Sequence, residues 1–290
     1  MEGAQRPVNR ISSRSTIVVT GANGWMGKEF IHNWKLREND ARIIPAPRLG
    51  PNSVEILAAD LAGQEDWTLV HLAFVTRERL STMHVDSYIS ANRAITESVQ
   101  ELILKFRPTA VVHASSGAVF KPDDIYGQLK LEQEEILRTA CDHLQIPCVN
   151  ARIWSVTGAF CPKPRNFLFF DLLYQALFEE EIHISAKHEV LRRYVDAGQF
   201  LSVANALAQL GISMDLDSGG GLVSAAYLGQ RILGLMDSGK SLVQEVHDGP
   251  SDHYFSRSNS MENMARVVGV DLGDLDWQIR NSISAFGGIE

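Results

Sequence analysis

Cysteine, long apolar stretches and surplus positive charge are all scarce in this sequence. It has three cysteines, Cys141, Cys148 and Cys161, and no two of them form a C-x-x-C pair. An odd number without paired spacing argues against both a disulfide framework and a structural zinc site. We therefore expect free, buried thiols and a protein of a reducing compartment.

A membrane-spanning helix needs roughly 18 consecutive apolar residues. The richest candidate, residues 167–178, is shorter and is interrupted by Asp171 and Gln175. Residues 1–15 contain three arginines but no apolar core, so they do not match a secretory signal. We expect a disordered leader over residues 1–15 and a cytoplasmic protein that has no membrane partner.

Basic side chains are outnumbered, with 27 of them against 35 acidic ones and a net charge of −8. Phosphate backbones are bound by a basic surface, so this balance argues against a nucleic-acid partner. The nine histidines show no H-x-x-x-H or H-E-x-x-H pattern. We therefore expect no metal site.

Strand and helix patterns alternate in the first half of the chain. Apolar and β-branched runs predict strands, and apolar residues at helical spacing predict long helices at about 86–105 and 124–144. The predicted strands are residues 16–20, 41–44, 54–58, 69–74, 110–114 and 148–153. This order is typical of an α/β fold, a doubly wound and mostly parallel Rossmann sheet, over residues 16–157.

Residues 158–290 predict a smaller, mixed α+β portion that binds the substrate, with some elements returning to the Rossmann domain. Helices are predicted at residues 167–179, 200–210, 228–237 and 261–268. Strands are predicted at residues 182–185, 190–195 and 222–226, and a loop at residues 215–221.

A glycine-rich turn joins the first predicted strand to the helix that follows it. The segment T-G-A-N-G-W-M-G begins at Thr20 and places glycines at Gly21, Gly24 and Gly27. Glycines allow the backbone to turn tightly and approach phosphate groups, while the helix N-terminus supplies N–H groups and a positive dipole. We expect the pyrophosphate of a dinucleotide to bind here, although the spacing is one residue longer than G-x-G-x-x-G.

Two further motifs carry chemistry. Tyr126 and Lys130 stand four residues apart, so they share one face of a predicted helix. A nearby ammonium favours the phenolate, which makes Tyr126 usable as an acid or base near neutral pH. Ser116 follows the predicted strand at 110–114, and ligands of open α/β sheets bind beyond the carboxyl ends of strands. The order of the motifs therefore predicts one common site.

In these motifs the sequence resembles the extended short-chain dehydrogenase/reductase family, the nucleotide-sugar epimerases, dehydratases and reductases. The resemblance also covers Asp60-Leu61, His71-Leu72-Ala73, Asn92 with Thr96, and A-R-I-W-S-V-T-G from Ala151. It implies Ser116, Tyr126 and Lys130 as the catalytic set. Cofactor contacts are expected from Gly21, Asn23, Gly24, Trp25, Met26, Gly27, Arg48, Asp60, Leu61, Leu72, Ala73, Phe74, Tyr126 and Lys130.

The resemblance further implies a substrate-binding set of Ser116, Gly117, Ser155, Arg165 and Arg192, in which Arg192 matches the family's diphosphate-binding arginine. Some positions depart from the family pattern. Phe120 and Ser155 replace the usual tyrosine and asparagine, and Gly198-Gln199 stands where an aspartate pair is common. The loop between Ser116 and Tyr126 is also short. These departures weaken the nucleotide-sugar prediction but not the cofactor prediction.

Arg48 follows the second predicted strand, where an acidic residue would select NAD and an arginine accommodates the 2′-phosphate of NADP. We therefore expect NADP(H) rather than NAD(H), and, by the resemblance, a homodimer formed by the two long helices. The leading hypothesis is an oxidoreductase or epimerase that acts on a nucleotide-activated sugar. A ketoreductase of a small secondary metabolite and a non-catalytic dinucleotide sensor remain the alternatives.

Overall fold

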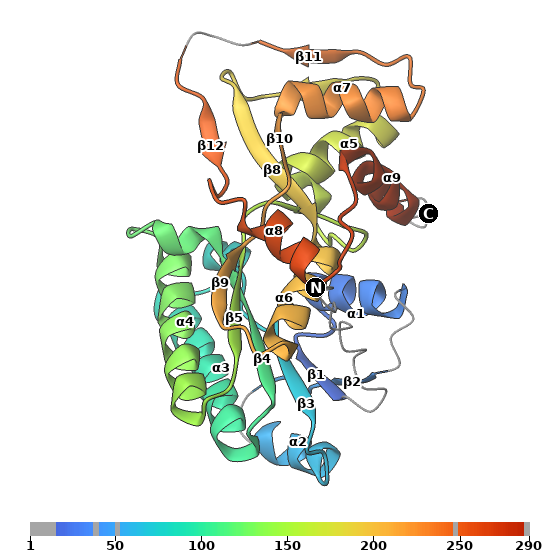
Figure 1. Cartoon of the computed structure of the whole chain (residues 1–290). Helices are drawn as coiled ribbons and strands as arrows, with labels where there is room; N and C mark the ends of the chain where they lie inside the picture. Colours follow the sequence, from blue (N-terminus) through green and yellow to red (C-terminus); the bar gives the residue numbers. More distant parts are fainter. Residues whose placement is uncertain (1–15, 37–40, 50–52, 246–248, 287–290) are drawn as a thin grey trace, which may run out of the picture.

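The computed structural model describes residues 16–36, 41–49, 53–245 and 249–286 (Figure 1). The leader expected over residues 1–15 lies outside the described residues. No helix in the described ranges is long and apolar enough to cross a membrane.

An all-parallel sheet of six strands occupies the lower half of the molecule in Figure 1. Its order is β2-β1-β3-β4-β5-β9. The strands are β1 (Thr16–Thr20), β2 (Arg42–Pro45), β3 (Trp67–His71), β4 (Ala110–Ser116), β5 (Cys148–Ile153) and β9 (Met214–Asp217). The predicted doubly wound α/β fold is confirmed.

Helices cover both faces of this sheet. One layer consists of α1 (Trp25–Leu36), α6 (Ala197–Gln209) and α8 (Ser260–Val267), and the other of α2 (Ser53–Leu61), α3 (Val85–Phe106) and α4 (Ile125–Leu144). Alternate residues of the strands face opposite layers, as strand geometry requires. Ile17 and Val19 pack with the first layer, whereas Val18 packs with the second.

The C-terminal portion lies above the carboxyl ends of the strands (Figure 1). Its core is built from helices α5 (Leu168–Phe178), α7 (Ala225–Leu235) and α9 (Leu275–Phe286), packed on short strands. These strands are β6 (Val156–Thr157), β7 (Ile182–Ile184), β8 (Val190–Asp196), β10 (Gly221–Ser224), β11 (Leu242–Gln244) and β12 (Asp252–Tyr254). Strand β8 pairs with β6, β10 and β12.

Two sequence predictions about secondary structure are wrong. Residues 54–58 form part of helix α2, because the buried residues Val54, Leu57 and Leu61 recur at helical spacing and only their β-branched start resembles a strand. Residues 215–217, predicted as a loop, belong to β9 at the edge of the sheet. Aspartate is uncommon in strands, so the two aspartates of β9 concealed it.

Candidate active site

The glycine-rich turn lies between the end of β1 and the start of α1. Gly21 has a φ of +68°, and a Cβ there would lie 2.8 Å from the backbone nitrogen of Ala73. A Cβ on Gly27 would lie 2.3 Å from the Gly21 carbonyl oxygen. Only glycine satisfies both the left-handed conformation and these close approaches. The first N–H groups of α1 have no partner within the helix, so this turn can receive an anion.

The end of β3 lies beside the turn and closes its other side. The Thr20 hydroxyl oxygen accepts the backbone N–H groups of Leu72 and Ala73 at 3.1 and 3.3 Å. Asn23 and Gly24 are exposed, and Trp25 and Met26 are half-buried. The predicted cofactor contacts at the turn and at Leu72-Ala73 are therefore brought together, and their shape fits a pyrophosphate.

Two other expected cofactor contacts, Arg48 and the pair Asp60-Leu61, lie at opposite edges of the sheet. Arg48 is exposed in the loop after β2, at the same edge as the turn, because Ala46 still hydrogen bonds to Val19 of β1 at 2.9 Å. Asp60 and Leu61 end helix α2 at the opposite, amino-terminal edge of the sheet, where Gln64 accepts the hydroxyl of Thr16. The strand predicted just before them, at residues 54–58, is part of helix α2, so the structure does not bring Asp60 and Leu61 to the turn.

Ser116 and Tyr126 meet at the carboxyl end of β4. Helix α4 is capped by Asp124, whose carboxylate accepts the N–H of Tyr126 at 3.2 Å. A Cβ on Gly127 would lie 2.1 Å from the Ala118 carbonyl oxygen, so this glycine allows the helix to pack tightly on the short helix η2 (Gly117–Phe120). Burial raises the pKa of Tyr126 to about 12, while a hydrogen bond with Ser116 acts in the opposite direction. Tyr126 therefore holds its proton at neutral pH.

Lys130 lies one helical turn further and is buried. Its ammonium donates to the Ala114 carbonyl at 2.7 Å and to Gln133 Oε1 at 3.2 Å, and it lies 3.8 Å from the centre of the Phe74 ring. Burial lowers the pKa of Lys130 to about 7, and Glu134 opposes that shift. Phe74 also packs edge-on against Tyr126 at 5.6 Å. The predicted catalytic residues thus lie in one site at the carboxyl end of β4, with Ser116 and Lys130 buried and Tyr126 half-buried.

An aromatic wall, formed by Phe120, Trp154 and Tyr254, borders this site and was not predicted from the sequence. Trp154 packs directly on Gly117, where a Cβ would lie 2.2 Å from the indole ring. The Trp154 ring stacks on Phe120 at 5.7 Å and contacts Tyr254 at 5.1 Å. Tyr254 belongs to β12, and burial raises its pKa while the nearby Ser116 acts in the opposite direction. The aromatic pair Tyr254-Phe255 was its only signal in the sequence.

Arg77 is a second residue that the sequence did not indicate. It lies in the short helix η1 (Arg77–Ser81), with its guanidinium 5.2 Å from the centre of the Tyr126 ring. It also forms an ion pair with Asp124, the residue that caps α4. Positive charge is therefore held beside Tyr126 by a residue that carries no recognisable motif.

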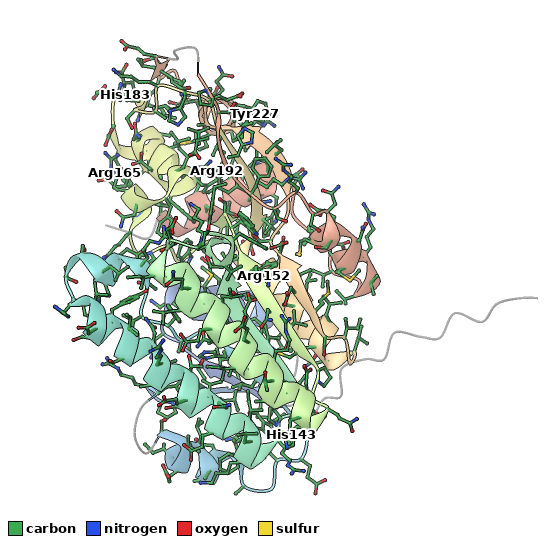
Figure 2. All side chains as sticks on the ribbon, turned by 90° about the vertical axis from the view of Figure 1, so that its left-hand side faces the viewer. His143, Arg152, Arg165, His183, Arg192 and Tyr227 are labelled. Atoms are coloured by element: carbon green, nitrogen blue, oxygen red, sulfur yellow. The ribbon has the colours of Figure 1, made fainter. Side chains whose placement is uncertain are left out.

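The two arginines expected to bind substrate occupy different surroundings (Figure 2). Arg192 forms an ion pair with Asp252 at 2.6 Å and lies 6.0 Å from the centre of the Tyr254 ring. Arg165 instead pairs with Asp171 and Glu179 at 3.1 and 2.8 Å. Among the contacts within the described part of the chain, Arg192 reaches the aromatic wall and Arg165 does not. Ser155 is half-buried next to Trp154 in the chain.

Glu29 of α1 connects the turn to the C-terminal portion. Its carboxylate accepts the indole N–H of Trp25 at 2.9 Å and the backbone N–H groups of Ala159 and Phe160 at 3.1 and 2.7 Å. Burial raises the pKa of Glu29 to about 7, although these three donors favour the charged form. One carboxylate therefore ties the loop after β6 to the first helix.

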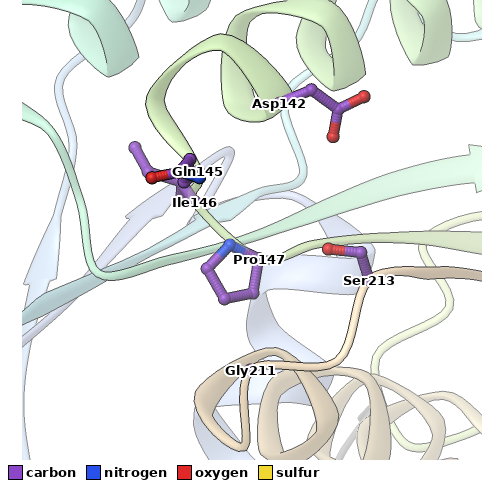
Figure 3. Close-up of a pocket in the computed structure, with 6 residues that line it drawn as sticks. All are labelled: Asp142, Gln145, Ile146, Pro147, Gly211 and Ser213. Carbon is purple, nitrogen blue, oxygen red and sulfur yellow. The ribbon is translucent and has the colours of Figure 1, made fainter.

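Elsewhere, a surface hollow of about 240 Å³ lies at the amino end of β5 (Figure 3). It is lined by Asp142, Gln145, Ile146, Pro147, Gly211 and Ser213. This is the opposite end of β5 from Ile153, which is paired with Ser116, so the hollow is separate from the candidate active site. Within the described residues, no group of three or more histidine, cysteine or acidic residues is arranged to hold a metal ion.

Comparison with known proteins identifies the family. The family model described as the NAD dependent epimerase/dehydratase family matches residues 17–209. A search of curated protein sequences finds no significant match. Since the model covers most of the chain, the protein belongs to the NAD dependent epimerase/dehydratase family, in agreement with the resemblance to extended short-chain dehydrogenases/reductases.

Solved structures agree with this fold. A UDP-N-acetylglucosamine 4-epimerase from Methanobrevibacter ruminantium, in complex with UDP-N-acetylmuramic acid, is 15% identical, with a TM-score of 0.74 over 95% of this chain and 99% of that one. A UDP-glucose 4-epimerase from Thermus thermophilus in complex with NAD is 14% identical, with a TM-score of 0.70 over 95% and 100%. RMD from Pseudomonas aeruginosa, complexed with NADPH, is 16% identical, with a TM-score of 0.72 over 95% and 99%.

Proposed function

We propose that this protein is an NADP(H)-dependent oxidoreductase or epimerase that acts on a carbonyl or secondary alcohol of a nucleotide-activated sugar. The observation that carries the proposal is the convergence of Ser116, Tyr126 and Lys130 at the carboxyl end of β4, beside a glycine turn that fits a pyrophosphate. Family membership supports the reaction class.

The three side chains have distinct roles in this proposal. A bound nicotinamide would supply or accept the hydride. Tyr126, which holds its proton at neutral pH, donates it to a carbonyl oxygen in reduction and takes it back in oxidation. The Ser116 hydroxyl, next to Tyr126, orients that oxygen. Lys130 places an ionisable amine one helical turn from Tyr126 and stabilises the phenolate when Tyr126 has lost its proton.

NADP(H) is favoured over NAD(H) because of charge near the ribose position. Arg48 is exposed at the edge of the sheet that holds the glycine turn, and the segment of residues 41–48 has no carboxylate. An arginine there can bind a 2′-phosphate, whereas an acidic side chain would bind the 2′-hydroxyl of NAD. Calorimetric titration with both cofactors tests this step, and tighter binding of NAD would contradict it.

A nucleotide sugar is favoured by Arg192, whose planar guanidinium suits a diphosphate. The structural neighbours with nucleotide-sugar ligands or names support the same class. Arg192 already pairs with Asp252, so a diphosphate would compete with that carboxylate.

One observation favours a second candidate function, the ketoreductase of a small metabolite. The aromatic wall beside Ser116 presents apolar ring surface, and Phe120 is 58% exposed. Thermal shift with uridine, guanosine, cytidine and thymidine diphosphates in the presence of NADP separates the two candidates. Stabilisation by one nucleotide supports the nucleotide sugar. No stabilisation, together with reduction of small hydrophobic ketones, supports the metabolite.

A homodimer formed through α3 and α4 also stays a proposal. The exposed faces of these helices carry the ion pair of Arg93 with Glu132, bonded at 2.9 and 3.0 Å. Light scattering tests it against the chain mass of 32.1 kDa.

A further inference from the structure

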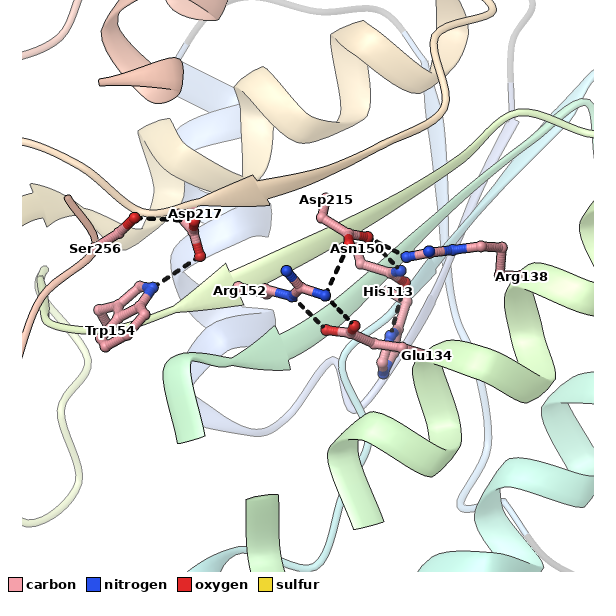
Figure 4. A network of polar contacts seen from close by, with 9 residues as sticks. All are labelled: His113, Glu134, Arg138, Asn150, Arg152, Trp154, Asp215, Asp217 and Ser256. Carbon is pink, nitrogen blue, oxygen red and sulfur yellow. Dashed lines mark hydrogen bonds and ion pairs between the residues drawn. The ribbon is translucent and has the colours of Figure 1, made fainter. Parts of the chain in front are cut away.

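A row of buried polar side chains crosses the sheet directly beneath Lys130 (Figure 4 shows its β4–β9 end). Thr20, His71, His113, Asn150 and Asp215 are register partners on β1, β3, β4, β5 and β9, and consecutive members are hydrogen bonded through their side chains or through Gln133 of α4. All except Asp215 are at most 1% exposed, as is Gln133. In such a setting each donor must meet an acceptor.

The Thr20 end of the row has a fixed direction. The Thr20 hydroxyl oxygen accepts the N–H of Ala73, and it shares the N–H of Leu72 with the Thr20 carbonyl oxygen, so both of its lone pairs are engaged. Its own hydrogen must therefore point to His71 Nδ1, 2.7 Å away. Burial lowers the pKa of His71, so the ring is neutral and carries its hydrogen on Nε2. His71 Nε2 lies 3.1 Å from the Gln133 amide group. Because this nitrogen carries the hydrogen, the Gln133 atom that faces it must be the amide oxygen.

The Asp215 end has the same direction. The Asp215 carboxylate forms ion pairs with Arg138 and Arg152 and accepts a hydrogen bond from the Asn150 side-chain N–H at 2.9 Å. Asn150 Oδ1 then faces His113 Nδ1 at 3.2 Å, so a neutral His113 must carry its hydrogen on Nδ1. The pKa of His113 is lowered to about 3 by burial, so the ring is neutral. Its Nε2, 2.7 Å from Gln133, is thus an acceptor and requires the amide nitrogen.

Lys130 makes the opposite demand on the same amide. In the structure Gln133 presents Oε1 to both His113 and Lys130, and Nε2 to His71 and Thr96. That orientation suits a charged amine, which can only donate. At the Thr20 end, this orientation makes His71 Nδ1 a third donor to the Thr20 oxygen. At the other end, it leaves two acceptors, His113 Nδ1 and Asn150 Oδ1, facing each other. Rotating the amide by a half turn removes both mismatches but points an N–H at Lys130.

We propose that Gln133 is a positioning residue that couples the protonation of Lys130 to the direction of this row, presenting Oε1 to the charged amine and Nε2 to the neutral one. In the neutral state every hydrogen bond from Thr20 to Asp215 runs the same way. The Thr96 hydroxyl, which donates to the Asn92 carbonyl at 3.0 Å, turns to the Gln133 oxygen. The row therefore favours the neutral form of Lys130.

Other titratable groups around Lys130 act independently of this direction. Glu134 on its own helix raises the pKa of Lys130, and it is held by Arg152 at 2.6 Å. From the sheet, His71 and His113 face the ammonium, and both are neutral. Tyr126 lies one turn earlier on α4. The two histidines and Tyr126 keep their charge near the Lys130 midpoint, since the pKa of each histidine is lowered and that of Tyr126 is raised to about 12.

The tautomers of the two histidines report the direction of the row. We expect nitrogen NMR of ¹⁵N-histidine-labelled protein, recorded from about two pH units below to about two above the Lys130 midpoint, to show both rings neutral throughout. His71 changes from Nδ1–H to Nε2–H and His113 from Nε2–H to Nδ1–H as the pH rises. Tautomers that stay constant over this range overturn the proposal. Neither cofactor nor substrate is added, so the outcome is independent of the proposed activity.

For Asp215→Asn, the proposal and simple electrostatics predict shifts of the Lys130 midpoint in opposite directions. Removing a negative charge disfavours an ammonium. The amide in this variant, however, can donate to a turned Asn150, which removes the mismatch between His113 and Asn150 while Gln133 Oε1 stays toward a charged Lys130. We therefore expect the shared midpoint to rise by about one pH unit, the effect of about one hydrogen bond.

Asp217→Asn is the matched control, because it removes the same charge from the same strand outside the row. Asp217 bonds instead to Trp154 and Ser256 (Figure 4). We expect its midpoint to be unchanged or lower. Equal shifts in the two variants, or a fall with Asp215→Asn, would overturn the coupling. Asp215 has a side chain 28% exposed, so the variant is expected to fold.

Discussion

The proposed cofactor side of Tyr126, formed by the glycine turn and the end of β3, and its proposed substrate side, formed by the aromatic wall, are built in different ways. The cofactor side depends on backbone, since a Cβ on Gly21 would meet Ala73 and Thr20 accepts two main-chain N–H groups. The substrate side depends on side chains from segments far apart in sequence. Trp154 and Tyr254 meet there because β12 pairs with β8. A shared dinucleotide can be bound by a constant backbone, whereas substrate choice requires side chains that differ between proteins.

The strongest test of this division is Tyr126→Phe, which removes the proton that both sides share. Turnover on the true substrate is expected to fall by about 10² to 10⁴, the range for lost acid–base catalysis. Cofactor affinity should barely change, because the ring remains. Tyr227→Phe is the control, since Tyr227 is 53% exposed on α7. Near wild-type turnover in Tyr126→Phe would remove Tyr126 from the mechanism.

The contact of Glu29, which ties helix α1 to the loop after β6, can be tested through the pH dependence of stability. The pKa of Glu29 is raised from 4.5 to about 7, so the folded state keeps a proton that the unfolded state has lost. The free energy of unfolding should therefore fall as pH rises through this window, by about 3 kcal/mol. Denaturant unfolding of wild type and Glu29→Gln at several pH values measures it. The variant should lack this slope, and equal slopes in both proteins would contradict the assignment.

Arg192→Ala should weaken the substrate side alone. The loss of charge-assisted bonds to a diphosphate is expected to cost about 1.5 to 3 kcal/mol, which appears as a higher KM. Arg165→Ala is the matched control, because Arg165 pairs with Asp171 and Glu179 instead. Calorimetry should show unchanged cofactor affinity in both variants. If the two arginine variants behave alike toward substrate, Arg192 has no special role.

Gly21→Ala should weaken the cofactor side alone, by about tenfold in affinity or 1.4 kcal/mol. Gly63→Ala separates the two causes of this loss. Gly63 also has a positive φ, of 76°, but nothing lies within 4 Å of a Cβ there. It should therefore cost stability without changing cofactor affinity. Similar affinities for both variants would show that close approach at the turn is unimportant.

The same division explains how much the sequence predicts. The glycine turn and the Tyr126–Lys130 pair are local patterns, so their positions follow from a strand, a turn and a helix. Asp60 was misplaced because α2 begins with residues that resemble a strand. Tyr254 was missed because its place depends on pairing with β8. Asp215 was assigned to a loop because its strand is stabilised by Arg138 and Arg152, which are distant in sequence.

Strand β9 also has a consequence for synthesis of the chain on the ribosome. Strand β9 forms one edge of the sheet and α6 covers one of its faces. Both come after α5, β7 and β8 in the chain, although those three elements belong to the C-terminal portion. Emergence of residues 16–157 alone leaves Val112 and Val149 without the helix that covers them. Exposed apolar surface of this kind is prone to aggregation. A chain that ends before residue 217 lacks a complete β9 and should therefore depend on chaperones. A longer chain contains all six strands of the sheet.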